Sequence, residues 1–171
     1  GIRTIDDIYK VLNAGADKIT INTIALNNLD FIKESSDIFG SQCIVCSIDV
    51  KYVDNQYKVF NKSRGILDIN PLELALDYQK YGAGEILLTS IDYEGSGKGF
   101  DIELIKSFKN KLEIPIILNG GMGKPNDAVE AIKNGADAIS AAYIFHFSQF
   151  TPDDIKEEMS KNNIITREIN R

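Results

Sequence analysis

Several apolar runs of this chain end in polar residues, at the points where the strands of an α/β protein would meet their loops. Asp49 stands near the end of the run 43–50, most of whose other residues are apolar. A carboxylate held at the mouth of a dry site has a raised pKa and can act as a general acid or base. We therefore predict that Asp49 is catalytic, and a solvated aspartate at a strand end is the alternative interpretation.

Glycine-rich turns follow two later runs, at residues 92–99 and 119–123. Such turns let backbone N–H groups approach a phosphate closely, and a following helix adds positive potential. The pair Asn22 and Thr23 ends an earlier run at a comparable place. We predict two phosphate sites, while glycines kept for turn geometry alone remain the alternative. The residues expected at the loop ends of the strands include Asn22, Thr23, Glu94, Gly95, Gly120, Gly121, Ala142 and Tyr143.

Two opposite charges occupy equivalent places at the other ends of two strands. Lys18 begins one run and Glu85 begins another. They could form an ion pair across the lower face of a closed sheet. The alternative is two exposed charges at the strand starts, because exposed ion pairs are common and contribute little.

Other catalytic patterns are missing from the sequence. His146 is the one histidine, so we expect no metal site and no Ser/His/Asp or Cys/His pair. Cys43 and Cys46 lie three apart in one apolar run, where side chains face opposite sides of a strand. We interpret them as small buried hydrophobic residues, and we expect no cofactor.

An internal repeat organises the chain around these residues. A shift of 120 positions carries Gly1, Asp7 and Gly15-Ala16-Asp17 onto Gly121, Asp127 and Gly135-Ala136-Asp137. Repetition of a helix followed by Gly-Ala-Asp and a short apolar strand indicates alternating helices and strands with near two-fold symmetry. Two related loops would then hold two similar ends of one substrate.

The apolar runs predict parallel strands that alternate with helices. An open doubly wound sheet and a closed (β/α)8 barrel both fit, and the repeat favours the barrel because half a barrel takes about 120 residues. We expect an α/β fold of the TIM-barrel family, as a single partial domain over residues 1–171 that is truncated at its N-terminus, with a hairpin around Asp54 and Asn55. The expected strands are 18–23, 43–50, 85–92, 114–118 and 138–143; expected helices lie within 4–14, 29–39, 70–81 and 102–111 and begin at Pro125 and Thr151.

Composition narrows the functional classes. The formal net charge is −6, whereas a nucleic-acid surface needs clustered lysine and arginine. The sequence contains no apolar run of the length of a membrane span and no signal-peptide pattern, so we expect a cytoplasmic protein without a membrane partner.

The runs 15–23 and 82–92, together with Ser47-Ile48-Asp49 and Ile144-Phe145-His146-Phe147, resemble the cyclase subunit of imidazole glycerol phosphate synthase. The resemblance covers essentially the whole chain and corresponds to the C-terminal two thirds of that barrel. It implies a lyase of histidine biosynthesis that receives ammonia from a glutaminase subunit in a heterodimer. The ammonia attacks a substrate with a phosphate at each end, and the products are imidazole glycerol phosphate and an aminoimidazole carboxamide ribotide.

The resemblance also implies roles for individual residues. Asp49 matches one of two acid–base aspartates, the other belonging to a strand ahead of this chain. Lys18 and Glu85 match the ammonia gate on the glutaminase-facing side, where we also place Asp17. Thr89 matches a residue near the substrate. One phosphate site is matched by Gly1, Asn22 and Thr23, and the other by Gly95, Gly120 and Gly121, with Glu94, Ala142 and Tyr143 beside it.

Some residues at the expected mouth depart from the family pattern. Glu94-Gly95-Ser96 replaces Asp-Gly-Thr, and Tyr143 stands where the family has a serine. These changes leave open a paralogue that amidinates an acetamido sugar for a surface polysaccharide. A non-catalytic docking barrel or an inactive fragment is the third alternative, and we expect these 171 residues alone to be inactive because five strands leave an open edge.

Overall fold

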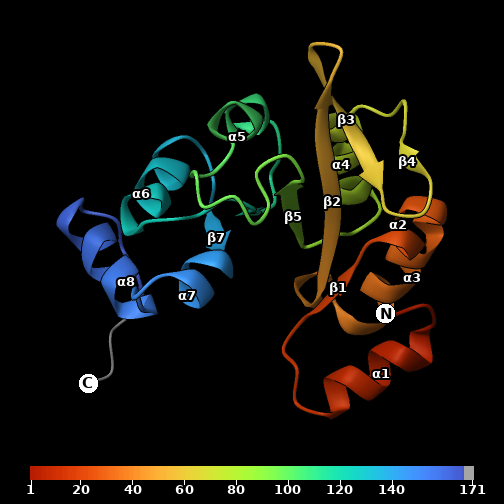
Figure 1. Cartoon of the computed structure of the whole chain (residues 1–171). Coiled ribbons are helices and arrows are strands. Elements are labelled where there is room, and N and C mark those ends of the chain that lie inside the picture. Colours follow the sequence, from red (N-terminus) through yellow and green to blue (C-terminus); the bar gives the residue numbers. More distant parts are fainter. Residues whose placement is uncertain (168–171) are drawn as a thin grey trace.

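The computed structural model describes residues 1–167, which fold around one curved sheet (Figure 1). Seven strands belong to it in the described residues, and five of them run parallel in the order β1-β2-β5-β6-β7. The predicted set of five parallel strands is therefore confirmed. Their bounds are β1 (Ile19–Ile21), β2 (Ile44–Val53), β5 (Glu85–Ser90), β6 (Ile116–Asn119) and β7 (Ala138–Ser140).

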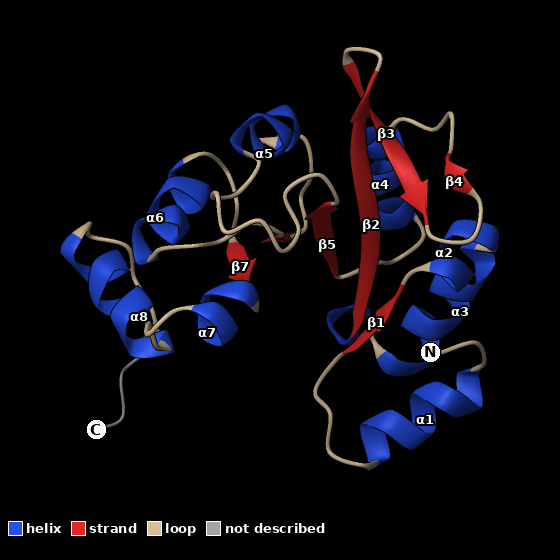
Figure 2. Ribbon diagram, viewed as in Figure 1, coloured by secondary structure: helices blue, strands red, loops and turns tan. Residues whose placement is uncertain are grey.

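Strand β2 is the longest and continues into the predicted hairpin, which projects beyond the other strands (Figure 2). Its partner β3 (Gln56–Asn61) is antiparallel, and β4 (Gly65–Ile66) pairs with β3 in turn. Asp54 and Asn55 form the two-residue turn with φ values of 52° and 61°. Both values lie in the left-handed region that a type I′ hairpin turn requires, and asparagine and aspartate tolerate it best among residues with a side chain.

The helices begin at capping residues that the sequence predicted. Thr4 and Asp7 form a capping box at the start of α1, and Thr151 and Asp154 form another at α8. Asn70 caps α4 through its side chain, with Pro71 in the first turn. The longer helices are α1 (Ile5–Asn13), α3 (Leu29–Phe39), α4 (Pro71–Lys80), α5 (Ile102–Phe108), α6 (Pro125–Lys133) and α8 (Pro152–Lys161).

The 120-residue repeat is visible in the elements themselves. Helix α6 lies 120 positions after α1, and the short helix α7 (Tyr143–Phe147) lies 120 positions after α2 (Thr23–Asn27). The repeated aspartates both close a helix start: Asp7 Oδ2 accepts the Thr4 N–H at 3.0 Å, and Asp127 Oδ2 accepts the Lys124 N–H at 3.0 Å. The repeat thus includes the capping chemistry that fixes where each helix begins.

Three strands end earlier than predicted, and the strand predicted at 114–118 begins only at Ile116. The strands expected to reach residues 23, 92 and 143 stop at Ile21, Ser90 and Ser140. Thr23 and Tyr143 begin short helices instead, which the sequence analysis missed because five residues show no clear helical period. Cys43 lies in the short 3-10 helix η1 (Ser41–Cys43) rather than in β2 and is only partly buried, so its prediction as a buried strand residue is wrong. Cys46 in β2 is buried, as predicted.

The core lies between the sheet and its helices. Cys46, Ile48, Ile86, Leu88 and Leu118 alternate along β2, β5 and β6 and are almost fully buried on the helix-covered face. The opposite face is less covered, because Thr20 and Ala138 are exposed and Leu87 and Ile117 are only half-buried. Within residues 1–167 the sheet is open, since β1 and β7 do not pair with each other.

Substitution of Gly84 by alanine should destabilise this core. A Cβ atom at Gly84 would overlap the carbonyl oxygen of Ser41, a backbone atom that cannot rotate away. We expect a loss of about 1–3 kcal/mol in the free energy of unfolding, as for other overpacked sites. Urea denaturation measures it, and Gly1→Ala is the control because no atom lies within 4 Å of its added Cβ. Equal stability of the two variants would contradict the packing described here.

Candidate active site at the carboxyl ends of the parallel strands

A row of polar residues crosses the sheet near the carboxyl ends of its strands. Asp49 of β2 pairs in register with Thr89 of β5, Thr89 with Asn119 of β6, and Asn119 with Ser140 of β7. Residues in register on adjacent strands point to the same face of a sheet. The amide Nδ2 of Asn119 donates to Thr89 Oγ1 at 3.2 Å, which ties two members of the row together.

Asp49 is half-buried in this row and has one hydrogen-bond donor from the neighbouring loop. Asn22 Nδ2 donates to Asp49 Oδ2 at 3.0 Å. Burial raises the pKa of the Asp49 carboxyl, the hydrogen bond from Asn22 opposes that shift, and the negative charge of Glu94 adds to it. The net direction is upward, which makes Asp49 more able to hold a proton than an exposed aspartate.

A cavity of about 250 Å³ opens beside the row, next to β6 and β7. Six of the predicted substrate-binding residues line it together. It is therefore the place where the sequence-predicted residues converge best. They are Glu94, Gly95, Gly120, Gly121, Ala142 and Tyr143, and Asn119, Met122, Ser140, Ala141, His146 and Phe147 complete the lining.

Backbone packing explains the glycines of the turn after β6. Gly121 has φ +105°, and a Cβ atom there would overlap the carbonyl oxygen of Gly99. The Gly99 N–H donates to Gly121 O at 2.8 Å, so the loop after β5 lies directly on this turn. Gly123 meets Gly97 O in the same way. The glycines are therefore required for the contact between two loops, whether or not a phosphate binds.

Tyr143 forms an aromatic part of the cavity wall. Its ring lies against Gly97, where an added Cβ atom would collide with the ring, and it packs on Phe147 with 4.8 Å between ring centroids. The wall is therefore aromatic here. The equivalent residue in the other copy of the repeat is Thr23.

The predicted gate residues lie at the opposite ends of the strands. Lys18 Nζ and the Glu85 carboxylate form an ion pair between the starts of β1 and β5, with β2 between them. The predicted ion pair is thus present. Glu85 and Thr89 are four residues apart on one strand face, so about 13 Å separates the ion pair from the polar row. Asp17 is exposed in the turn ahead of β1.

Asp49 and Thr89 belong to the polar row but do not line the cavity. Two further predicted residues belong to neither. Gly1 is exposed ahead of α1, and Thr23 is exposed at the start of α2. Neither is among the described residues that line the cavity. Asn22, from the same predicted phosphate site, is linked to the polar row by its hydrogen bond to Asp49. Ser140 was not predicted, because the strand was expected to continue to residue 143 and its end at Ser140 is seen only in the structure.

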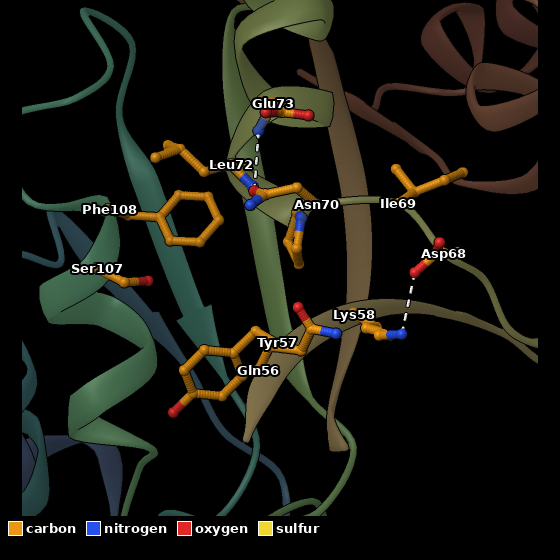
Figure 3. A pocket seen from close by; sticks show the side chains of 11 residues that line it. Gln56, Tyr57, Lys58, Asp68, Ile69, Asn70, Leu72, Glu73, Ser107 and Phe108 are labelled. Atoms are coloured by element: carbon orange, nitrogen blue, oxygen red, sulfur yellow. Dashed lines mark hydrogen bonds and ion pairs between the residues drawn. The ribbon is translucent and has the colours of Figure 1, made fainter. Parts of the chain in front are cut away.

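A second cavity, of about 400 Å³, lies on the outer side between β3 and the start of α4 (Figure 3). Lys58 and Asp68 form an ion pair at its edge, with 2.9 Å between Nζ and Oδ1. The figure shows Phe108 of α5 on its other side. None of the predicted site residues lines it among the described residues.

The described residues contain neither a candidate metal site nor a candidate membrane span. No group of three or more histidine, cysteine, aspartate or glutamate side chains within residues 1–167 is placed to hold a metal ion. In the same part of the chain, no helix is both long enough and apolar enough to span a membrane.

Parallel strands flanked by helices, with polar residues at the carboxyl ends, define an α/β protein with its candidate site at the loop ends of the strands. Residues 1–151 match the family model described as histidine biosynthesis protein, a TIM-barrel family. The chain belongs to this family.

Curated relatives agree with this assignment. The chain is 57% identical over 167 residues to the putative imidazole glycerol phosphate synthase subunit hisF2 of Campylobacter jejuni. It is 48% identical over 171 residues to the imidazole glycerol phosphate synthase subunit HisF of Leptospira biflexa. Each match covers 98% of this chain and 67% of the relative. The resemblance predicted from the sequence is confirmed, and so is a role connected with histidine biosynthesis at the level of the family.

Substitution of Asp49 by asparagine should stabilise the protein at neutral pH. The pKa of Asp49 is raised above 3.8 in the folded state, so its contribution to stability is greatest below pH 3.8 and is lost as pH rises through the folded value. Asparagine keeps an acceptor for Asn22 without this loss. We expect Asp49→Asn to have the higher melting temperature at pH 7 and the difference to shrink at pH 3. A difference of the same size at both pH values would contradict the raised pKa.

Proposed function

We propose that this chain is the cyclase subunit of imidazole glycerol phosphate synthase. In this reaction it uses ammonia from a glutaminase subunit to close the imidazole ring and release an aminoimidazole carboxamide ribotide. The observation that carries the proposal is Asp49, a half-buried carboxyl with a raised pKa. It stands in the same in-register row as Asn119 and Ser140, which line the cavity at the carboxyl ends of the strands. The names of the relatives support the same reaction. We place the lyase, as one partial barrel unit over residues 1–171, in the cytoplasm.

Asp49 would move protons during ring closure. Ammonia must lose protons when its nitrogen bonds to the acceptor, and the departing group must gain one. A carboxyl whose pKa is raised by burial can both accept and return a proton near neutral pH. Asn22, which donates to Asp49, would hold the carboxylate toward the acceptor.

The ion pair at the opposite ends of the strands supports a path for ammonia. Lys18, Glu85 and Asp17 would face the glutaminase, and ammonia would enter beside the ion pair. The face of the sheet between Glu85 and Thr89 carries Leu87, and that of β2 carries Val45 and Ser47. These side chains are small or apolar, which suits a neutral molecule crossing the roughly 13 Å to Asp49.

The acceptor would lie across the polar row with one end at each of the repeated loops. Gly1, Asn22 and Thr23 would bind one phosphate. Gly95, Gly120, Gly121 and Ala142 would bind the other through backbone N–H groups, with Glu94 and Thr89 between the two ends.

One observation favours a second acceptor. The aromatic wall formed by Tyr143 on Gly97 makes one end of the site unlike the other. A paralogue that delivers ammonia to an acetamido sugar, giving an acetamidino sugar, needs no phosphate at that end. Ammonia-dependent consumption of the ribotide substrate by the full-length protein separates the two: turnover supports the cyclase, and its absence with turnover of an acetamido sugar supports the paralogue.

Loss of the Asp49 carboxyl should slow turnover strongly. We expect Asp49→Asn in the full-length protein to lower kcat with ammonia and the ribotide by 10²–10⁴-fold, the usual contribution of general acid–base catalysis. A stopped assay that quantifies imidazole glycerol phosphate measures it. Asp6→Asn is the matched control, because Asp6 is an exposed carboxylate paired with Lys10 on α1. Unchanged turnover by Asp49→Asn would rule out the acid–base assignment and leave a non-catalytic docking role.

Loss of the Lys18 charge should impair turnover with glutamine more than turnover with free ammonia. We expect Lys18→Met to lower glutamine-dependent turnover at least tenfold and free-ammonia turnover less than twofold, because only the first depends on transfer at the gate. Parallel assays with glutamine and with ammonium salt measure this ratio. Lys33→Met is the control, since Lys33 forms an exposed ion pair with Asp37 on α3. Equal losses with both nitrogen sources would argue against a gate.

A further inference from the structure

One buried carboxylate has no part in the proposed chemistry. Asp101 is 4% exposed and caps the start of α5. It accepts hydrogen bonds from Tyr57 Oη at 2.8 Å, from Ser90 Oγ at 3.0 Å and from the Leu104 N–H at 3.1 Å. A buried carboxylate satisfied by three donors is strongly held in place.

The three donors come from three different segments. Tyr57 lies on β3 of the hairpin, Ser90 is the last residue of β5, and Leu104 is in α5. Residues 91–100 form the loop between Ser90 and Asp101. The bond between these two side chains therefore closes the base of that loop.

The loop 91–100 builds one wall of the candidate active site. Glu94 and Gly95 line the 250 Å³ cavity, and the Glu94 N–H donates to Ser90 O at 3.0 Å. Further along, the Gly99 N–H donates to Gly121 O at 2.8 Å. The position of the loop base therefore determines where Glu94 stands relative to Asp49 and the glycine turn.

The hairpin is tied to the same loop at a second point. Asp92 Oδ2 accepts the Tyr52 N–H at 2.8 Å, and the Tyr52 and Tyr57 rings pack edge to face with centroids 4.9 Å apart. Burial and the hydrogen bond to Asp101 raise the pKa of the Tyr57 phenol, so it remains a proton donor at neutral pH.

We propose that Asp101 is a positioning residue that closes the loop 91–100 through Ser90 and so shapes the wall of the cavity that carries Glu94 and Gly95. Its bond to Tyr57 joins the hairpin to this closed loop. The functional part of the proposal rests on the proposed function, in which this cavity receives one end of the acceptor; the closure of the loop does not. Asp101 acts through the loop and does not contact the acceptor.

Three substitutions separate the bonds. Ser90→Ala removes only the donor at the loop base, while the cap of α5 and the bond to Tyr57 remain. Tyr57→Phe removes only the hairpin donor and is the matched control. Asp101→Asn is the conservative variant, because its amide oxygen still accepts from Tyr57 and Leu104 and its NH₂ group can donate to Ser90 Oγ.

Amide hydrogen exchange in the full-length protein, followed by NMR, tests the closure. We expect Ser90→Ala to accelerate exchange at Gly99 and Glu94 at least tenfold and to leave Ile86, whose N–H bonds Pro115 O in the sheet, unchanged. Tyr57→Phe and Asp101→Asn should stay within threefold of the unsubstituted protein at Gly99. Equal acceleration at Gly99 and Ile86, or none at Gly99, would overturn the proposal, because the bond would then be generally stabilising or irrelevant to the loop.

Steady-state kinetics with the ribotide test the consequence for the site. We expect Ser90→Ala to raise KM for the ribotide at least fivefold while kcat stays within twofold, because the loop shapes binding and Asp49 is untouched. A fall in kcat at constant KM would overturn the positioning role. If the unsubstituted protein does not consume the ribotide, the proposed function fails, and the exchange measurement still decides whether Asp101 closes the loop.

Discussion

The in-register parallel pairing of β2, β5, β6 and β7 is the constraint on which the candidate site depends. Because these strands run in one direction, all their carboxyl ends meet at one edge of the sheet, and equivalent residues share one face. This pairing brings Asp49, Thr89, Asn119 and Ser140 into a row although they span more than half of the chain. It also sends Lys18 and Glu85 to the far edge. A shift of one residue in the register of β5 would turn both Thr89 and Glu85 to the helix-covered face and destroy both sites at once.

The repeat supplies two similar frameworks whose functional residues differ. Asp7 and Asp127 cap α1 and α6 in the same way, so the two halves share the geometry of their helix starts. The residues after β1 and β7 then diverge: Asn22 contacts Asp49, whereas Ala142 has no polar side chain to offer, and Thr23 corresponds to Tyr143. Both copies of the repeat therefore share the same capped helix start. They differ in the two residues that follow the strand, which are Asn22 and Thr23 in one copy and Ala142 and Tyr143 in the other. Under the proposed function, the two copies would therefore present different side chains to the two ends of the acceptor.

Much of this arrangement could be predicted from the sequence, because the signals are local. The capping box at Thr4, the proline after Asn70 and the turn at Asp54 and Asn55 each act within a few residues. The repeat placed Lys18 and Glu85 at equivalent strand starts, but it left an ion pair and two exposed charges as alternatives. The role of Asp101 could not be predicted, since its three donors lie 44, 11 and 3 residues away and are brought together only by tertiary packing. Short helices such as α7 were missed for a related reason: their five residues are stabilised by contacts with the rest of the fold rather than by their own sequence.

The glycines of the turn after β6 show why residue type alone is a weak guide to binding. Gly121 and Gly123 are needed because the loop after β5 passes within backbone contact of them, and any side chain there would separate the two loops. The same close packing brings Gly95 and Glu94 to the cavity and lets the charge of Glu94 reach Asp49. The first effect of the glycine turn is therefore to let the loop after β5 lie against it. Backbone N–H groups of the glycine turn could face an anion only when the loop after β5 is packed against the turn. The candidate site therefore depends on the closed position of this loop.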